Sequence, residues 1–298
     1  MQRPIRLITV FALPVFLTIL FSVAAAKTAE IRKPVWAGKF YPATRSELLA
    51  SLDTLSEKAA ETKIALPQGK QLKAVVIPHA GYVYSGWTAA HVGNVLKGSR
   101  YKKVILMGPD HRVGFADVAV SDVDAYQTPL GEVPLDPDAA KLRARSPLFH
   151  AVPVSDRMEH SLEVVLPFLQ YALPEFSMVP MVMGRQTDLQ KVTDQIAGLL
   201  NNDTLIVVSS DLSHFLPYPD AVKQDTETIR MILNLEDDRL LPRENAACGV
   251  IPLCCVIRLA GRYHWTPRLI HYSNSGDTAG TKDRVVGYTA IAFYGDNS

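Results

Sequence analysis

Cysteine is scarce in this chain of 298 residues, which contains only Cys248, Cys254 and Cys255. Three cysteines are a poor basis for the paired disulfide framework that stabilises small secreted domains. If all three lie on one helix, Cys248 and Cys255 are roughly 10 Å apart along its axis, too far for a disulfide bond. The sequence therefore argues against a disulfide scaffold, and the apolar neighbours of Cys254 and Cys255 indicate thiols in the core.

Two further absences concern charge and motifs. The formal net charge is only +1 and no lysine- or arginine-rich run follows the N-terminal segment, so we expect no nucleic-acid partner. The sequence has no glycine-rich nucleotide loop and no Gly-x-Ser-x-Gly elbow, which argues against nucleotide binding and serine-hydrolase chemistry. What is present is a globular composition, with 48% hydrophobic and 20% charged residues.

The N-terminal segment has the pattern of a leader. Arg3 and Arg6 precede an apolar run over residues 7–23, and residues 24–26 form the small-residue pattern of a cleavage site. The sequence thus predicts a signal peptide over residues 1–26 and an exported, periplasmic protein. The alternative is an uncleaved membrane anchor over residues 7–26, because about 20 apolar residues span a bilayer. Residues 31–298 are expected to form a single domain.

Apolar strands alternate with amphipathic helices from residue 31 onward. Strands are predicted over residues 73–77, 103–107, 118–123, 177–183, 204–209, 268–271 and 285–294. Helices are predicted over residues 45–58, 87–97, 137–145, 162–171, 188–200, 221–234 and 250–260, the last capped by Gly261. Several strands are continuously apolar, as expected for a sheet covered on both faces. The predicted fold class is therefore α/β, a central sheet flanked by helices on both faces, with the final strand at or near an edge.

Two of the apolar strands end in a histidine near a proline. His79 follows Pro78 at the end of one strand, and His111 follows Pro109 and Asp110 at the end of another. In an open α/β sheet, ligands gather outside the carboxyl ends of the strands, which brings these two side chains to one edge. Neutral imidazole is the commonest metal ligand, so the pair predicts a metal site. For either histidine alone, a turn residue bonded to the backbone is the simpler interpretation.

Cys248 is a candidate third ligand, because it precedes a glycine and lies outside the apolar run of the other cysteines. A small buried residue at a helix start is an equally good interpretation. Helix N-termini lower the pKa of a thiol, which suits a metal ligand or a redox-active group. Two imidazoles with a thiolate favour iron, copper or zinc over magnesium and calcium.

Other polar residues are candidates for proton transfer. Asp211 is expected either to orient a ligating imidazole or to cap the following turn. His214 is expected to act as a general acid or base, because its ordinary pKa lies near neutrality. His160 is a further candidate and would share a helix face with Glu163, although a polar helix start explains both residues equally well.

The remaining candidates concern the ligand pocket. Tyr82 is expected to wall a pocket beside His79, and Asp110 either to contact substrate or to shape a turn. Four histidines lack a strand-end context and are interpreted as structural: His91, His150, His264 and His271.

An ordered set of motifs resembles the Memo family, whose bacterial members are called AmmeMemoRadiSam system protein B. The set covers nearly all of the chain that follows the leader. Its motifs are Trp36-Ala37-Gly38-Lys39-Phe40-Tyr41-Pro42, Pro78-His79-Ala80-Gly81-Tyr82, Gly108-Pro109-Asp110-His111, Tyr126-Gln127-Thr128-Pro129-Leu130-Gly131, Glu159-His160-Ser161-Leu162-Glu163, Ser209-Ser210-Asp211-Leu212-Ser213-His214, Cys248-Gly249 and Val286-Gly287-Tyr288.

The resemblance implies a fold like that of the class III extradiol dioxygenases, with a cleft at the strand ends. It also implies that His79, His111 and Cys248 bind the metal, with iron or copper favoured over zinc. The dioxygenases use two histidines and a carboxylate, so a cysteine as third ligand argues against plain ring cleavage. The expected function is that of a non-haem metal-dependent, dioxygenase-like oxidoreductase of unknown substrate. The alternative is a non-catalytic module that binds metal or peptide on the same fold.

The resemblance also bears on partners. Some relatives have a second histidine after the His111 position, where this chain has Arg112, which either favours an anionic substrate or faces solvent. The ligand is thus a small molecule or peptide, and a membrane contact is expected only if the leader is uncleaved. The bacterial family name implies a radical S-adenosylmethionine partner enzyme. Such enzymes need a reducing cytoplasm, so an exported chain is not expected to contact one.

Overall fold

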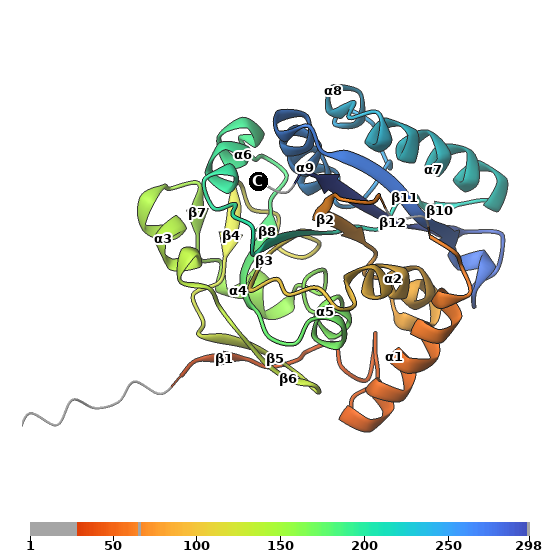
Figure 1. The fold of residues 1–298 in the computed structure, drawn as a ribbon, viewed down its shortest axis with the longest axis horizontal. Coiled ribbons are helices and arrows are strands. Elements are labelled where there is room, and N and C mark those ends of the chain that lie inside the picture. The colour runs from red at the N-terminus through yellow and green to blue at the C-terminus, as the bar shows by residue number, and fades with distance from the viewer. Residues whose placement is uncertain (1–28, 65–66, 297–298) are drawn as a thin grey trace, which may run out of the picture.

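The computed structural model describes residues 29–64 and 67–296 of the chain (Figure 1). The predicted signal peptide, residues 1–26, and the alternative anchor over residues 7–26 both lie outside this described part. Among the residues that are described, no helix has the length and apolar character needed to cross a membrane.

The main sheet has nine strands in the described part of the chain, in the order β10-β12-β2-β9-β3-β8-β4-β7 with β11 also paired to β12. Strands β2, β9, β3 and β8 are parallel and form the centre of the sheet. On either side of this centre, β12 runs antiparallel to β2 and β4 runs antiparallel to β8. The carboxyl ends of the parallel strands therefore meet at one edge. The strands span β2 Gln71–Ile77, β3 Lys103–Pro109, β4 Val118–Val120, β7 Phe149–His150, β8 Ser177–Met183, β9 Thr204–Ser209, β10 His214–Leu216, β11 Thr266–Asn274 and β12 Val285–Gly295.

Helices cover both faces of this sheet, as Figure 1 shows. On one face lie α1 (Arg45–Ala60), α2 (Tyr82–Leu96) and α5 (Leu166–Ala172). On the other lie α3 (Pro137–Arg145), α6 (Leu189–Ala197), α7 (Tyr218–Leu233), α8 (Asp237–Leu240) and α9 (Val250–Tyr263). A small separate sheet joins β1 (Ile31–Arg32), β5 (Ala125–Thr128) and β6 (Gly131–Pro134).

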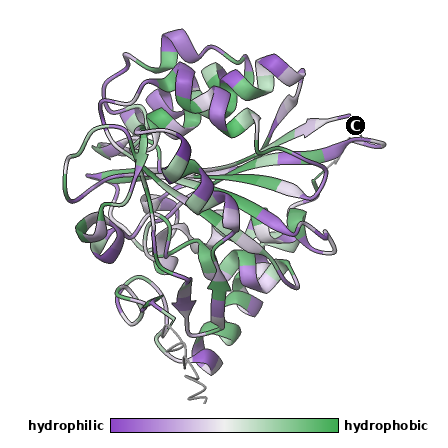
Figure 2. Ribbon diagram, turned by 90° about the vertical axis from the view of Figure 1, so that its left-hand side faces the viewer, coloured by the Kyte–Doolittle hydropathy of each residue, from purple (hydrophilic) through white to green (hydrophobic). Residues whose placement is uncertain are grey.

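The two faces explain the continuously apolar strands. Successive residues of a strand point to opposite sides, so Val75 and Ile77 of β2 enter the core beneath α1 and α2. Ala74 and Val76 enter the opposite core with α6 and α9. Figure 2 shows the central strands largely in green, the hydrophobic colour, between helices with purple hydrophilic stretches. The predicted α/β class is confirmed, and the final strand, β12, lies next to β10 and β11 near an edge, as predicted.

Helix α2 begins five residues before the predicted start at residue 87. Gly81 is its N-cap, and aromatic, β-branched and glycine residues with weak helix propensity fill its first turns. Packing against α1 outweighs that propensity. A Cβ atom on Gly86 would lie 2.8 Å from a methyl carbon of Leu55, so the glycine allows the two helices to approach closely.

Two predicted helix ends are wrong. Gly261 is not the C-cap of the 250–260 helix, because α9 continues to Tyr263 and His264 adopts the left-handed conformation at φ 56°. The N–H of Trp265 then bonds the Ala260 carbonyl at 2.9 Å, which closes the helix without a glycine. The predicted helix over residues 162–171 starts only at Leu166, so His160 and Glu163 do not share a helix face.

Candidate metal centre

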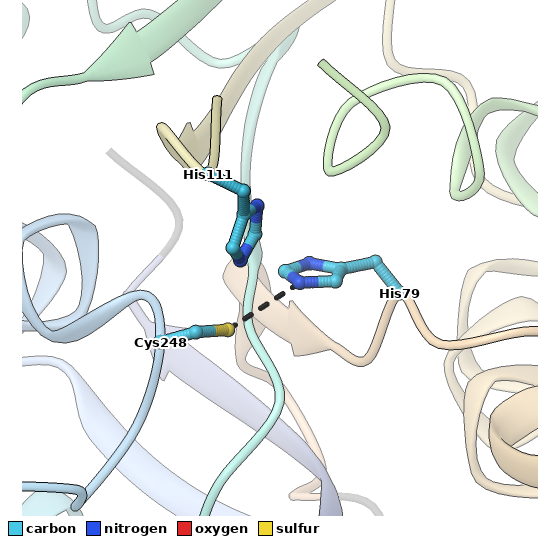
Figure 3. Close-up of side chains that lie close together, drawn as sticks. All are labelled: His79, His111 and Cys248. Atoms are coloured by element: carbon cyan, nitrogen blue, oxygen red, sulfur yellow. Dashed lines mark hydrogen bonds between the residues drawn. The ribbon is translucent and has the colours of Figure 1, made fainter. Parts of the chain in front are cut away.

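Three side chains from distant parts of the chain meet at the carboxyl edge of the sheet (Figure 3). His79 follows β2, His111 follows β3, and Cys248 lies in the turn before α9. Their potential ligand atoms all lie within 4.8 Å of one another. The sulfur of Cys248 lies 3.3 Å from His79 Nε2, and the ring centroids of His79 and His111 are 5.2 Å apart. We call these three candidate ligands the metal-ligand set.

The hydrogen bonds of His79 fix which of its nitrogens is free. Its Nδ1 lies 2.7 Å from the hydroxyl oxygen of Ser209, and that hydroxyl also lies 2.5 Å from the Ser161 carbonyl. A serine hydroxyl has one hydrogen, which it donates to the carbonyl, so the oxygen accepts from His79 Nδ1. The lone pair of Nε2 is therefore directed toward Cys248. This is the tautomer that a metal-binding histidine needs.

Glu159 does the same for His111. One carboxylate oxygen accepts from His111 Nδ1 at 2.9 Å and the other from its backbone N–H at 2.7 Å. The same carboxylate accepts the backbone N–H groups of His160 and Ser161, both at 2.8 Å. Burial alone raises the pKa of Glu159, but the hydrogen bond from His111 and the closeness of His160 outweigh it and hold the pKa well below its usual range. Glu159 is thus an ionised, buried acceptor that leaves His111 Nε2 free.

Cys248 is held by backbone bonds to Asp211. The N–H of Asp211 donates to the sulfur at 3.2 Å, and the N–H of Cys248 donates to the Asp211 carbonyl at 3.2 Å. Close packing with the end of β9 also requires Gly249, where a Cβ atom would lie 2.7 Å from the Ser210 side chain. The turn therefore brings the sulfur close to His79 through backbone contacts.

Burial shifts the pKa values of His79 and Cys248, and for Cys248 the direction differs from the prediction. Burial, followed by repulsion from His111 and His160, holds the pKa of His79 well below its usual range, so its imidazole is neutral near pH 7. Burial, followed by the charge of Asp211, raises the pKa of the Cys248 thiol. The prediction that the helix start lowers this pKa is wrong, because loss of solvent outweighs the helix dipole. A cation that binds the sulfur must therefore displace its proton.

These donors fit a transition metal. Metal–nitrogen and metal–sulfur bonds of roughly 2.0–2.3 Å at angles near 90–110° separate the two ligand atoms by roughly 3.1–3.6 Å. The 3.3 Å distance between His79 Nε2 and the Cys248 sulfur lies in this range. Two imidazole nitrogens and a sulfur suit iron, copper or zinc, and they do not suit the oxygen-preferring magnesium and calcium.

His160 lies against the metal-ligand set beneath two aromatic rings. Its ring centroid lies 4.5 Å from that of His111 and 5.3 Å from that of His79. Phe40 and Trp36 cover it at 5.0 and 5.7 Å. Its Nδ1 lies 3.2 Å from a Glu159 oxygen, but it is out of hydrogen-bond alignment and has no other partner. The structure thus brings His160 beside the cluster.

Glu163 holds the segment that carries these aromatic rings. Its carboxylate accepts the backbone N–H groups of Val35 and Trp36 at 3.0 and 2.8 Å and the Tyr41 hydroxyl at 2.8 Å. It also forms an ion pair with Arg32 at 2.7 Å, in which both side chains are almost fully buried. The expected partnership of Glu163 with His160 is replaced by this role.

Asp211 and His214 occupy different layers of the site. Asp211 accepts the backbone N–H of His79 at 2.8 Å, while its other oxygen lies 3.9 Å from His79 Nε2. It therefore fixes the backbone of a ligand residue and does not orient the ring through Nδ1. His214 begins β10 and its Nδ1 donates to the Leu212 carbonyl at 2.8 Å. No direct bond between His214 and the metal-ligand set occurs in the described residues.

The three predicted substrate contacts, Tyr82, Asp110 and Arg112, differ in their exposure and in their hydrogen bonds. Tyr82 is largely buried and its hydroxyl donates to the Val164 carbonyl at 3.1 Å, and it also lines a surface pocket together with Phe40. Asp110 shapes a turn, because its carboxylate accepts the backbone N–H groups of Arg112 and Val113 at 3.3 and 3.2 Å. Arg112 is exposed beside the site.

The sequence-based candidates omit two residues that the geometry makes important, Ser209 and Glu159. Both fix the tautomer of a candidate ligand. Ser209 follows an apolar strand and Glu159 precedes His160, but neither position indicates which imidazole it meets. Trp36 and Phe40 are likewise visible in the sequence only as members of a motif.

The central mixed sheet with helices on both faces is compatible with a dioxygenase-like α/β fold, and two histidines and a cysteine converge at its carboxyl edge. Comparison with known proteins identifies the family of the chain. The family model described as Memo-like protein matches residues 32–292, and the chain belongs to this family. Similar proteins, each described as MEMO1 family protein, include those of Aeropyrum pernix, with 36% identity over 88% of this chain and 99% of the relative, and Aquifex aeolicus, with 35% identity over 89% and 99%. That of Pyrobaculum arsenaticum is 33% identical over 89% and 99%.

Proposed function

We propose that this protein is a non-haem metal-dependent oxidoreductase of the dioxygenase-like class, which holds iron or copper between His79, His111 and Cys248. The convergence of these three ligand atoms within 4.8 Å carries the proposal. It is supported by the acceptors on both Nδ1 atoms, because such partners orient metal-binding histidines and raise their basicity.

The metal-ligand set and the residues around it have separate roles in the proposed function. A bound iron or copper ion supplies one-electron redox chemistry, which protein side chains alone do not provide. His79 and His111 present their Nε2 atoms, and Cys248 presents a sulfur that releases its proton on binding. Asp211 holds the backbone of His79 in place.

Proton movement falls to His160 and His214. His160 lies beside His111, within reach of a substrate bound at the cluster. His214 donates from Nδ1 to a carbonyl, which leaves Nε2 to accept a proton. Phe40 and Trp36 cover His160 and exclude water from that side of the site.

Metal analysis of the purified protein tests the proposal. The wild type is expected to bind close to one iron or copper ion per chain, and a His79→Ala/His111→Ala variant to lose it. Cys248→Ser is expected to lose affinity, whereas Cys254→Ser, which changes a buried thiol in the core, is the matched control. Equal and negligible metal in the wild type and the double variant contradicts the proposal. Oxygen consumption with catechols then measures turnover.

A second candidate function is a non-catalytic module that binds metal or peptide. The observation that favours it is Cys248, which supplies a thiol where the dioxygenases have a carboxylate. A thiolate donates strongly and is itself oxidised, so it is poorly suited to repeated oxygen chemistry. Stable metal binding without oxygen consumption would favour this function over the oxidoreductase.

A further inference from the structure

Two cations lie against one tryptophan ring beside the metal-ligand set. The guanidinium carbon of Arg112 lies 4.8 Å from the centroid of the Trp36 ring, and the Lys39 ammonium nitrogen lies 5.3 Å from it. The electron-rich face of an indole attracts cations, so Trp36 keeps both charges in one place. The same ring contacts that of His160 at 5.7 Å, and His160 contacts His111. The two cations therefore lie at the rim of the candidate metal centre.

Trp36 is itself held rigidly. Its backbone N–H donates to the buried Glu163 at 2.8 Å, and its indole N–H donates to the Met158 carbonyl at 3.2 Å. Because Glu163 is also paired with Arg32 inside the protein, this anchor is not exposed to solvent. The indole is thus fixed at both its backbone and its ring, and it places the cations in advance of any ligand.

Neither cation is neutralised by the protein. In the part of the chain that the structure describes, the ion pairs leave out Arg112 and Lys39. The neighbouring carboxylates are engaged elsewhere, since Asp110 accepts backbone N–H groups and Glu159 accepts from His111. Both cations are solvent-exposed and available to a ligand.

We infer that Trp36, Lys39 and Arg112 form an oxyanion subsite, and that the substrate carries a carboxylate or phosphate group. This inference rests on the proposed function for the identity of the reacting site, although the subsite shares no residue with the metal-ligand set. A guanidinium presents parallel N–H donors that match the two oxygens of a carboxylate or phosphate. The ligand's charge is then recognised at the rim, while its reacting end reaches the two imidazoles and the sulfur.

Two probes that differ only by a carboxylate test the subsite. Catechol and 3,4-dihydroxybenzoate are titrated by calorimetry, without oxygen, into the full chain with and without iron or copper. The dihydroxybenzoate is expected to bind about tenfold more tightly, the change that one charge-assisted contact commonly gives. Inorganic phosphate as competitor separates the two oxyanions. If it removes the difference, the subsite accepts either group, and if it does not, the subsite is restricted to carboxylates.

Matched variants assign the effect to the subsite. Arg112→Gln keeps the aliphatic stem and removes the charge, so we expect the affinity ratio to fall close to one while catechol affinity and metal content stay the same. Lys39→Gln is expected to reduce the ratio in part. Lys58→Gln is the control, because Lys58 also lies against a tryptophan, 4.2 Å from the Trp87 ring, and the expected ratio is that of the wild type.

The outcomes separate this inference from the proposed function. Equal affinities of the two probes for the wild type, binding of neither at millimolar concentration, or an unchanged ratio in Arg112→Gln overturns the subsite. Metal binding with equal probe affinities refutes the subsite alone. A preference for the dihydroxybenzoate in a chain that binds no iron or copper supports the subsite and refutes the proposed function.

Discussion

The His79 Nε2 atom and the Cys248 sulfur lie 3.3 Å apart, although 169 positions separate the two residues in the chain. Each atom is directed by a fixed partner. Ser209 occupies Nδ1 of the histidine at 2.7 Å, and the backbone N–H of Asp211 reaches the sulfur at 3.2 Å. The pair is therefore built into the end of the sheet, and it does not depend on two mobile side chains meeting by chance.

The first prediction concerns Ser209→Ala. Without the hydroxyl, His79 Nδ1 loses its acceptor and the imidazole can turn or change tautomer. We expect metal affinity to fall roughly 10–100-fold, as is typical when the partner of a ligating histidine is removed. The change is measured by competition with a chromogenic chelator. Ser273→Ala removes a buried hydroxyl that bonds Thr88 instead, and it is expected to keep wild-type affinity. Equal losses in the two variants would show that the effect is a general one on packing.

Glu159→Gln tests the support of His111. In the wild type, both oxygens of Glu159 accept N–H groups. In the glutamine variant, an NH₂ group replaces one of these oxygens, so at least one N–H that now donates to Glu159 loses its acceptor. We expect a loss of about 1–3 kcal/mol in the free energy of unfolding and a large loss of metal affinity. Urea denaturation and metal titration measure the two effects. Wild-type metal affinity in this variant would contradict the role of Glu159.

Glu163→Gln tests the anchor of the aromatic segment. It removes one charge of a buried ion pair with Arg32, and breaking such a pair costs about 3–5 kcal/mol. We expect a large fall in the urea midpoint and a change in Trp36 fluorescence. Lys191→Gln breaks an exposed pair with Asp188 on α6 and should leave the midpoint where it is. Similar shifts in both variants would contradict the importance of burial.

Acid is predicted to destabilise the protein partly through His91 and His271, whose rings stack at 4.0 Å. Burial, followed by repulsion from His91, lowers the pKa of His271 to about 4, and burial lowers the pKa of His91. In the unfolded chain both titrate at about 6.5, so the unfolded state takes up protons first as the pH falls. The stability of the folded state that depends on these two neutral histidines is fully present above about pH 6.5 and is lost as the pH drops toward 4.

His271→Gln tests this acid sensitivity. The variant is expected to lose less stability than the wild type between about pH 6.5 and pH 4, by roughly 1–2 kcal/mol after a discount for the partial exposure of the ring. Urea midpoints at several pH values provide the measurement. His264→Gln changes an exposed histidine and should follow the wild-type curve. Parallel curves for His271→Gln and the wild type would exclude this residue as a source of acid sensitivity.

Much of the fold follows from the sequence because the central strands are apolar on both sides. The predicted strands over residues 177–183 and 204–209 coincide with β8 and β9, since each residue of such a strand enters one of the two cores. The meeting of His79 and His111 is predictable for a related reason, because parallel strands finish at the same edge.

What the sequence does not reveal depends on contacts between distant segments. Tyr82 follows Gly81, two residues after His79, and lines a pocket, but the sequence does not reveal that its hydroxyl donates to the Val164 carbonyl. The pairing of Glu159 with His111 joins positions 48 apart, and no local pattern encodes it. The left-handed His264 ends α9, although Gly261, three residues earlier, offers the more usual signal.

The origin of the metal-ligand set in three remote segments also has a consequence for the order of events during folding. Closing the loop from His79 to Cys248 is costly for a chain without structure, so the ligand atoms meet only after the sheet and the turn before α9 have assembled. An ion cannot nucleate this fold as it does in a zinc finger, where ligands are near neighbours. Under the proposed function, metal loading is therefore a late, post-folding step, and the gain in thermal stability is expected to rise with free metal concentration by mass action.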